Sequence, residues 1–228
     1  MSQFWEQRLD DIGRQLHSMS ELTENNVALA LRALAERDDK LCAEVEEADS
    51  RIDALEVHVD DMVITFMATH APTARDCRLM LAASKISNNL ERTADEATKI
   101  ARRVRELNTE PLLEISREIS MVGEVAHEML RDSIAAFLKV DNELLIEVIA
   151  RDRSVDSIKK QIERDLTRQM EEQPEVIMRA LHLMTIVRAI ERVADHATNI
   201  AEEAYYLYNA EDIRHDPSRK SAPATAKS

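Results

Sequence analysis

Residues 91–101 read ERTADEATKIA, and residues 191–201 repeat the stretch as ERVADHATNIA. Eight of the eleven positions are identical, and the differences fall at Thr93, Glu96 and Lys99. Such self-similarity indicates an internal duplication. Each copy places a Glu and an Asp four residues apart, which on a helix is one turn apart on the same face. Carboxylates at this spacing repel each other by some tenths of a kcal/mol, so something should offset the repulsion.

The composition is that of a helical protein. Hydrophobic residues make up 44% of the 228 residues and charged residues 32%, whereas only 2 Gly and 5 Pro are present and aromatic residues make up 3%. Few turns and many charges are typical of long helices. A chain of this length buries roughly 70% of its unfolded surface, so it can form a core as one long domain or as two small ones.

The charge balance narrows the choice of partners. The formal net charge is -14 and the sequence pI is about 5.0. Such a chain is repelled by nucleic acid and by anionic lipid. Cations and basic protein surfaces are the better candidates, and we expect no nucleic-acid partner.

The cysteines and the apolar runs indicate a compartment. Cys42 and Cys77 are the only cysteines and form no CxxC motif, which favours a reducing environment. The first residues, MSQFWEQRLDD, contain no apolar signal-peptide region. No apolar run reaches the roughly 18 residues that a membrane span needs. We therefore expect a cytoplasmic protein.

Apolar residues recur at helical spacing through most of the chain. The pattern predicts helices over about residues 3–37, 39–70 and 73–107 in the first half, and over about 111–140, 142–172 and 174–209 in the second. Arg37-Asp38-Asp39, Ala71-Pro72-Thr73 and Asn108-Thr109-Glu110-Pro111 mark breaks, with Pro72 and Pro111 suited to the first turn of the following helix.

Helices of this length, joined by breaks of a few residues, have to fold back antiparallel. The expected fold class is therefore all-α, with six long antiparallel helices that form two tandem, duplicated three-helix bundles. The expected domains are residues 1–108 and 109–209. Residues 210–228 are polar and rich in Pro, Ser and Ala, and we predict a disordered tail there.

A second acidic pair appears when the halves are aligned at an offset of 103 residues. Asp49 and Asp53 then correspond to Asp152 and Asp156. Asp53 lies 19 residues before Pro72 and Glu91 lies 19 after it, whereas Asp156 lies 18 before Pro174 and Glu191 lies 17 after it. Across each antiparallel helix pair, the two acidic pairs are therefore expected to lie at the same level.

Four carboxylates that come together require a cation, a nearby Arg or shared protons. All-oxygen sites suit Mg, Mn, Ca or Fe better than structural zinc. The alternative is that these acids form the solvated margin of amphipathic helices, with Arg51, Arg92 and Arg192 as weak surface partners. The pattern alone leaves both readings open.

Catalytic motifs are scarce. Glu124 and His127 have the Glu-x-x-His spacing of di-iron bundles, but the required second copy is missing, so His127 is interpreted as a helix-face residue. His196 is interpreted as a surface or interface residue. No nucleophile with a base and no Gly-rich phosphate loop is present. We do not expect an enzyme.

The duplicated plan, the Pro turns and the paired ER-x-A-D-x-A-x-x-I-A stretches closely resemble the PhoU family of phosphate-specific transport accessory proteins. The resemblance spans about residues 3–209 and implies two three-helix bundles side by side, with metal clusters held by surface acids in some members. It implies a divalent or multinuclear metal, with Fe, Mn, Mg or Zn as candidates. The implied ligands are Asp49, Asp53, Glu91 and Asp95 in the first half, and Asp152, Asp156, Glu191, Asp195 and Asn199 in the second. Lys99 stands where the first half would need the counterpart of Asn199, and its charge is expected to compete with a cation.

The resemblance also implies a function. It predicts a non-enzymatic negative regulator of phosphate uptake and of the phosphate-starvation response. This regulator is expected to bind no nucleic acid and to meet the membrane only through its partner proteins. Its implied partners are the ATPase subunit of the phosphate-specific ABC transporter and a PhoR-type sensor histidine kinase, with a homodimer as the expected assembly. Two alternatives remain: a metal-storage bundle or metalloenzyme that uses the same acids, and a scaffolding bundle without any ion.

Overall fold

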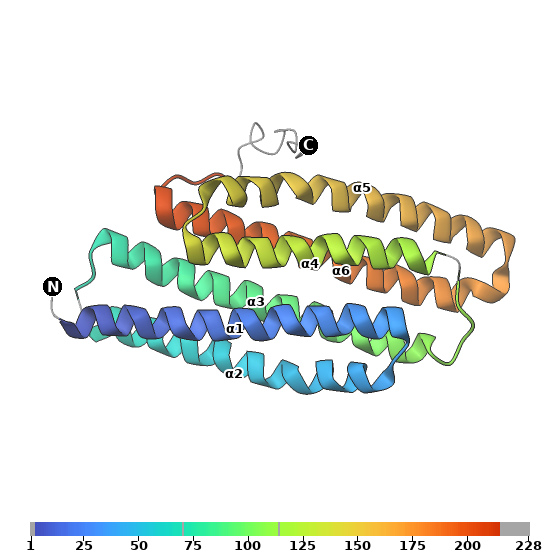
Figure 1. The fold of residues 1–228 in the computed structure, drawn as a ribbon, viewed down its shortest axis with the longest axis horizontal. Helices are drawn as coiled ribbons and strands as arrows, with labels where there is room; N and C mark the ends of the chain where they lie inside the picture. Colours follow the sequence, from blue (N-terminus) through green and yellow to red (C-terminus); the bar gives the residue numbers. More distant parts are fainter. Residues whose placement is uncertain (1–2, 70, 114, 215–228) are drawn as a thin grey trace.

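The computed structural model describes residues 3–69, 71–113 and 115–214, and all regular structure in these ranges is helical. The α-helices are α1 (Gln3–Glu36), α2 (Asp39–Thr69), α3 (Ala74–Leu107), α4 (Ser116–Lys139), α5 (Asn142–Glu172) and α6 (Ile177–Asn209). A short 3-10 helix, Pro174–Val176, precedes α6. Figure 1 shows α1–α3 as one antiparallel group and α4–α6 as a second one beside it. The predicted all-α class is confirmed.

The predicted helix boundaries are correct at most of the breaks. α1 ends at Glu36 and α2 begins at Asp39. Between them, Arg37 has a φ of 57°, in the left-handed region that often ends a helix. Thr73 caps α3, because its side chain accepts from the backbone N–H of Asp76 while its own N–H donates to Asp76 Oδ2 at 2.9 Å. Pro72 therefore precedes the cap, and its predicted place in the first turn was wrong. The end predicted for the second helix, His70, lies outside the described residues.

The predicted start of the fourth helix at Pro111 was also wrong, because α4 begins at Ser116. Two arginines hold the linker in a non-helical path. Arg37 donates to the backbone carbonyls of Leu107 and Glu110, each at 2.6 Å, and Arg179 donates to that of Pro111 at 3.0 Å. Carbonyls bonded in this way are satisfied without a helix.

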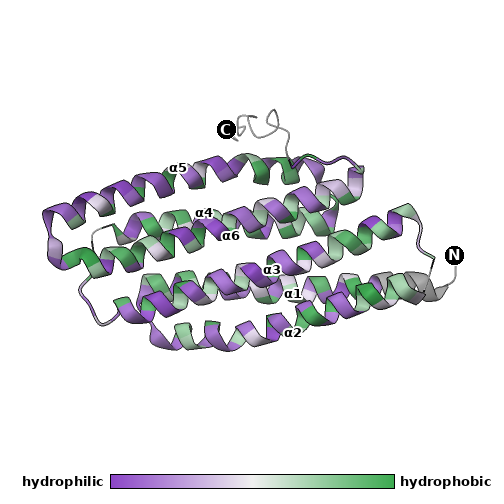
Figure 2. Ribbon diagram, turned by 180° about the vertical axis from the view of Figure 1, so that it is seen from behind, coloured by the Kyte–Doolittle hydropathy of each residue, from purple (hydrophilic) through white to green (hydrophobic). Residues whose placement is uncertain are grey.

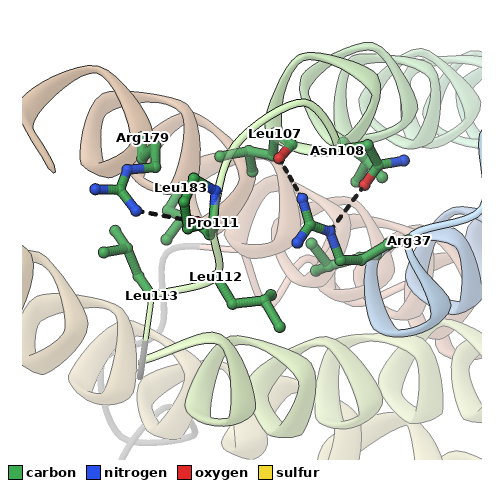
Figure 3. A pocket seen from close by; sticks show the side chains of 10 residues that line it. Arg37, Leu107, Asn108, Pro111, Leu112, Leu113, Arg179 and Leu183 are labelled. Atoms are coloured by element: carbon green, nitrogen blue, oxygen red, sulfur yellow. Dashed lines mark hydrogen bonds between the residues drawn. The ribbon is translucent and has the colours of Figure 1, made fainter.

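Figure 3 shows the apolar pocket that the linker covers, with Arg37 and Arg179 on either side of it. Leu34, Leu107 and Leu183 contribute to its wall. Its volume of about 30 Å³ is the share of one water molecule in the liquid. Ligand pockets are roughly ten times larger or more, so this pocket is a packing feature of the linker.

α3 and α6 join the two halves. Each packs against both other helices of its own half and against the other. The buried apolar side chains of all six helices form one continuous core. Polar contacts flank this seam, including Arg192 Nη1 to Glu96 Oε1 at 3.2 Å and Lys85 Nζ to Glu203 Oε1 at 2.9 Å. Within the described ranges, no helix has the length and apolar character that a membrane span requires.

The segment after α6 begins against the bundle. Ile213 is only 3% exposed and belongs to the core, and Arg214 Nη1 lies 3.5 Å from Glu203 Oε1. The apolar side chain of Ile213 explains this contact. The remainder of the predicted disordered tail, residues 215–228, lies outside the described residues.

Candidate metal centre

The first acidic cluster lies on the surface between α2 and α3. Two hydrogen bonds fix the register of these helices: Ser84 Oγ donates to Asp60 Oδ1 at 2.6 Å, and Asn88 Nδ2 donates to Glu56 Oε1 at 3.0 Å. One turn further along both helices, this register brings Asp53 level with Glu91. The acids predicted to meet in the first half are therefore brought into one neighbourhood.

The electrostatics of the first cluster follow from this arrangement. Burial raises the pKa of Glu91 to about 7, and the negative charges of Asp95, Glu56, Asp53 and Asp49 add to the effect. Burial and the neighbouring Asp53 likewise raise the pKa of Asp49. A carboxyl whose pKa is raised in this way has too little positive charge nearby to offset the cost of burying its ionised form.

Two buried oxygens lie beside the first cluster, on α2 and α3. Asp49 Oδ1 and Thr98 Oγ1 are both buried without a hydrogen bond of standard geometry to any described residue, although Thr98 lies near enough to Asp49 to lower the pKa of its carboxyl. Thr98 lies on α3, one turn beyond Ala94, and is almost fully buried. At the equivalent position of the second half, Thr198 Oγ1 is also buried without a hydrogen bond to any described residue. Buried oxygens without donors are expected to gain from a proton or a cation.

The second cluster lies between α5 and α6 and contains its own cation. Lys159 Nζ donates to Glu191 Oε1 at 2.7 Å, and Lys160 Nζ lies 3.6 Å from Asp156 Oδ2. Burial raises the pKa of Asp195 to about 6, with further contributions from Glu191, Asp152 and Asp156, whereas Lys159 opposes the shift. The offset of 103 residues aligns Lys159 with Glu56. Sequence reasoning missed this lysine, although the same alignment that paired the aspartates contains the signal.

Lys99 does not neutralise the first cluster as a whole. Its Nζ donates to Glu96 Oε1 at 2.9 Å and lies 3.9 Å from Asp95 Oδ2. Glu96 is almost fully buried at the seam between the halves, where Arg192 also reaches it. The charge of Lys99 is therefore shared between Asp95 and a residue outside the cluster, whereas Lys159 in the second cluster pairs with Glu191.

Asn199 faces the seam. Its Nδ2 donates to Asn89 Oδ1 at 3.3 Å, and His196 Nδ1 lies 3.1 Å from the same oxygen. Asn199 also lines an open groove of about 530 Å³ between the halves, together with Asp152 and Asp195. His196 is buried at this interface, which agrees with its interpretation as an interface residue, and burial and Arg92 lower its pKa to about 4.

The donor set fits a hard divalent cation in its chemistry. The clusters supply carboxylate oxygens, and in the first half the buried Asp49 Oδ1 lies near the hydroxyl of Thr98. In the described ranges, however, no three His, Cys, Asp or Glu side chains converge closely enough to hold a metal ion as they stand. A bound cation would therefore require rotation of exposed acids such as Asp53 and Asp95.

His127 has a different environment. Its Nε2 lies 3.7 Å from Glu24 Oε1 of α1, and burial lowers its pKa. It faces another helix rather than a cluster of carboxylates, as its interpretation as a helix-face residue predicted. The Glu-x-x-His spacing therefore gives no support to a di-iron site.

Comparison with known proteins identifies the family of this duplicated, acid-bearing bundle. The family model described as the PhoU domain matches twice, over residues 16–104 and 119–204. The chain belongs to the PhoU family. The first match falls within α1–α3 and the second within α4–α6, the two groups that lie side by side in Figure 1.

Similar proteins of this family cover nearly the whole chain. A Pseudomonas putida protein named "Phosphate-specific transport system accessory protein PhoU homolog" is 36% identical over 218 residues, which are 94% of this chain and 84% of that protein. A protein of the same name from Aquifex aeolicus is 37% identical over 91% of this chain and 94% of its own length. The crystal structure of PhoU from Pseudomonas aeruginosa matches with a TM-score of 0.89 at 34% identity. The match covers 91% of this chain and 100% of the Pseudomonas aeruginosa chain. The Streptococcus pneumoniae PhoU structure, with a TM-score of 0.84 at 23% identity, supports the fold alone.

Proposed function

We propose that this protein is a negative regulator of phosphate uptake and of the phosphate-starvation response. Its relatives are named as accessory proteins of the phosphate-specific transport system, and the family model covers both halves of the chain. The single observation that carries the proposal is this two-fold match. The protein acts by contact with the ATPase subunit of the phosphate-specific ABC transporter and with a PhoR-type sensor kinase, and it damps both when phosphate is plentiful.

The molecule suits a regulator that works through contacts. Long helical faces offer ridges and grooves to a partner helix, and the acidic surface complements basic ones. We place the protein in the cytoplasm, where it meets the membrane only through these partners, and we assign it no catalytic activity. It forms a homodimer, which light scattering on the purified chain tests directly.

Deletion of the gene tests the regulatory role. The deletion strain should express phosphate-starvation genes in high phosphate, and the intact chain supplied from a plasmid should restore repression. Purified transporter ATPase and sensor kinase should each be retained by the immobilised protein. Unaltered phosphate-responsive expression and uptake in the deletion strain would contradict the proposal.

We also propose that the first acidic cluster holds a divalent cation. Burial and the mutual repulsion of its acids, which raise the pKa of Glu91 and of Asp49, support this assignment. Titration with Mn²⁺, followed by electron paramagnetic resonance, should show saturable binding that D53N and E91Q weaken. Equal binding by wild type and variants would reject the site, whereas redox or hydrolytic turnover by the metal-loaded protein would favour the metalloenzyme alternative.

A further inference from the structure

The outer face of α2 carries exposed apolar side chains among its acids. Val57 and Ile64 are 60% and 64% exposed, and Met67 on α2 and Leu81 on α3 are exposed as well. Glu56, Val57, Asp60, Ile64 and Met67 follow each other at spacings of one, three and four residues, so they share one face of the helix. Together with Leu81 these residues are called the α2–α3 strip below.

The acids of the α2–α3 strip have neutral partners only. Glu56 accepts from the amide of Asn88 and Asp60 accepts from the hydroxyl of Ser84. In the part of the chain that the structure describes, neither carboxylate forms an ion pair with Lys or Arg. Two negative charges therefore remain uncompensated beside the exposed apolar groups.

The second half shows that this surface is not a general consequence of the fold. The residues aligned with Glu56, Val57 and Ile64 are Lys159, Lys160 and Thr167. Lys159 pairs with Glu191, and Arg188 Nε lies 3.1 Å from Glu163 Oε1, where Glu163 aligns with Asp60. On α5, charges are balanced and the two most exposed apolar positions are polar.

Among the described elements, α2 packs only against α1 and α3, and at one edge of the α2–α3 strip Asp60 lines an open pocket with Lys85 and Arg214. Figure 2 shows apolar residues gathered toward the end of α2 that leads into the turn before α3. Exposed apolar groups beside uncompensated charge are typical of surfaces that bind protein. The acids exclude an anionic membrane as the occupant, because phosphate headgroups would be repelled.

We propose that the α2–α3 strip is a docking surface for a basic amphipathic helix of a partner protein. Glu56 and Met67 are 11 residues apart in α2, or roughly 17 Å at 1.5 Å per residue, which matches three turns of a docked helix. Apolar side chains of that helix contact Val57, Ile64, Met67 and Leu81, while its Lys or Arg residues meet Glu56 and Asp60. The inference rests on the proposed function, since it names the surface that receives one of the regulated partners.

A synthetic helical peptide of Lys and Leu, about 18 residues long and labelled with fluorescein, serves as the probe. Its affinity for the full chain is measured by fluorescence anisotropy in the presence of a chelator, so that metal binding does not interfere. A peptide with the same composition in scrambled order lacks an apolar face and is the control. The amphipathic peptide should bind saturably and at least about tenfold more tightly than the scrambled one.

One strip variant, V57K/I64T, takes its residues from the second half, and another, E56Q/D60N, removes the two negative charges. V57K/I64T should lower the affinity for the amphipathic peptide by about tenfold or more, because the variant removes apolar contact and adds positive charge. E56Q/D60N should lower the affinity for this peptide about threefold and reduce the salt dependence of binding. M121K, which alters an equally exposed apolar residue of α4 (59%), should stay within about twofold of wild type. Circular dichroism confirms that each variant is folded.

Binding that V57K/I64T leaves unchanged, or that M121K weakens equally, would overturn the docking surface. The outcome is separate from the test of the regulatory role, because the peptide assay needs neither transporter nor kinase. If the strip variants lose the peptide but still repress phosphate-starvation genes in the deletion strain, the surface stands and its assignment to those regulated partners is wrong.

Discussion

Lys159 donates a hydrogen bond to Glu191 across the α5–α6 contact, at a position where the first half carries Glu56. Lys159 Nζ and Glu191 Oε1 are 2.7 Å apart, and both side chains are mostly buried. This one substitution places a mostly buried positive charge beside Glu191 in the second acidic cluster, whereas in the first cluster Lys99 Nζ lies 3.9 Å from Asp95 Oδ2. We therefore expect the duplicated clusters to differ in their affinity for cations.

Exchange of these residues should exchange the affinities. K159E should raise the affinity of the second cluster for Mn²⁺, and E56K should lower that of the first, each by about tenfold, because a neighbouring charge changes sign. Isothermal titration measures both. K139E, which changes net charge equally at the end of α4, is the control and should leave both affinities within about twofold.

Stability should depend on pH through Glu91. Its pKa is raised from 4.5 to about 7, so the folded protein holds a proton that the unfolded chain releases between these values. The stabilisation is present below about pH 4.5 and is lost as pH rises through about 7. Urea denaturation in chelator should therefore show falling stability over this window, and E91Q should flatten the slope. E44Q, at an exposed position of α2, should keep the wild-type slope.

The two glycines should respond oppositely to alanine. A Cβ at Gly13 meets nothing within 4 Å, so G13A should stabilise the protein by about 0.5–1 kcal/mol through helix propensity. A Cβ at Gly123 would lie 2.6 Å from Leu31 Cδ2 where α4 packs against α1. The side chain of Leu31 has to move, which offsets the propensity gain or exceeds it. Thermal denaturation of both variants measures the difference, and an equal gain would contradict the close approach.

Asn26 should be replaceable at a gain. It is fully buried in α1, and neither atom of its side-chain amide has a hydrogen-bond partner. A buried amide of this kind costs about 1–3 kcal/mol, and leucine has a similar branched shape, so N26L should raise the free energy of unfolding by about 1 kcal/mol. N25L, at the exposed neighbouring position, should change it by less than about 0.5 kcal/mol. Loss of stability in N26L alone would show that the amide is satisfied in solution.

The helices could be predicted because their signals are local. Apolar periodicity, Asp38 and Asp39 at one break and Thr73 at another specify where helices begin and end within a few residues. The start of α4 was not predictable in this way. It depends on Arg37 and Arg179, which come from distant parts of the chain to bind the linker carbonyls.

The acidic sites were predictable in part. Counting residues from Pro72 placed Asp53 level with Glu91, and the hydrogen bonds between α2 and α3 agree with that register, because an antiparallel pair has a fixed rise per residue. In the second half, counting from Pro174 paired Glu191 with Asp156, and this pairing stays a prediction, because Glu191 bonds to Lys159, one turn from Asp156 along α5. Counting could not reveal that Lys159 turns toward Glu191 or that Lys99 turns toward Glu96. Long side chains choose among many rotamers, and their neighbours on other helices decide which one is adopted.

The sequence by itself determined the duplication, the helical class and the acids that recur in both halves, since these follow from residue type and spacing along one chain. Only the tertiary structure decided which carboxylates stay uncompensated, which apolar groups stay exposed on α2, and how α3 and α6 join the halves. Charge balance and burial depend on distances between helices, and those distances are set when all six pack into one core.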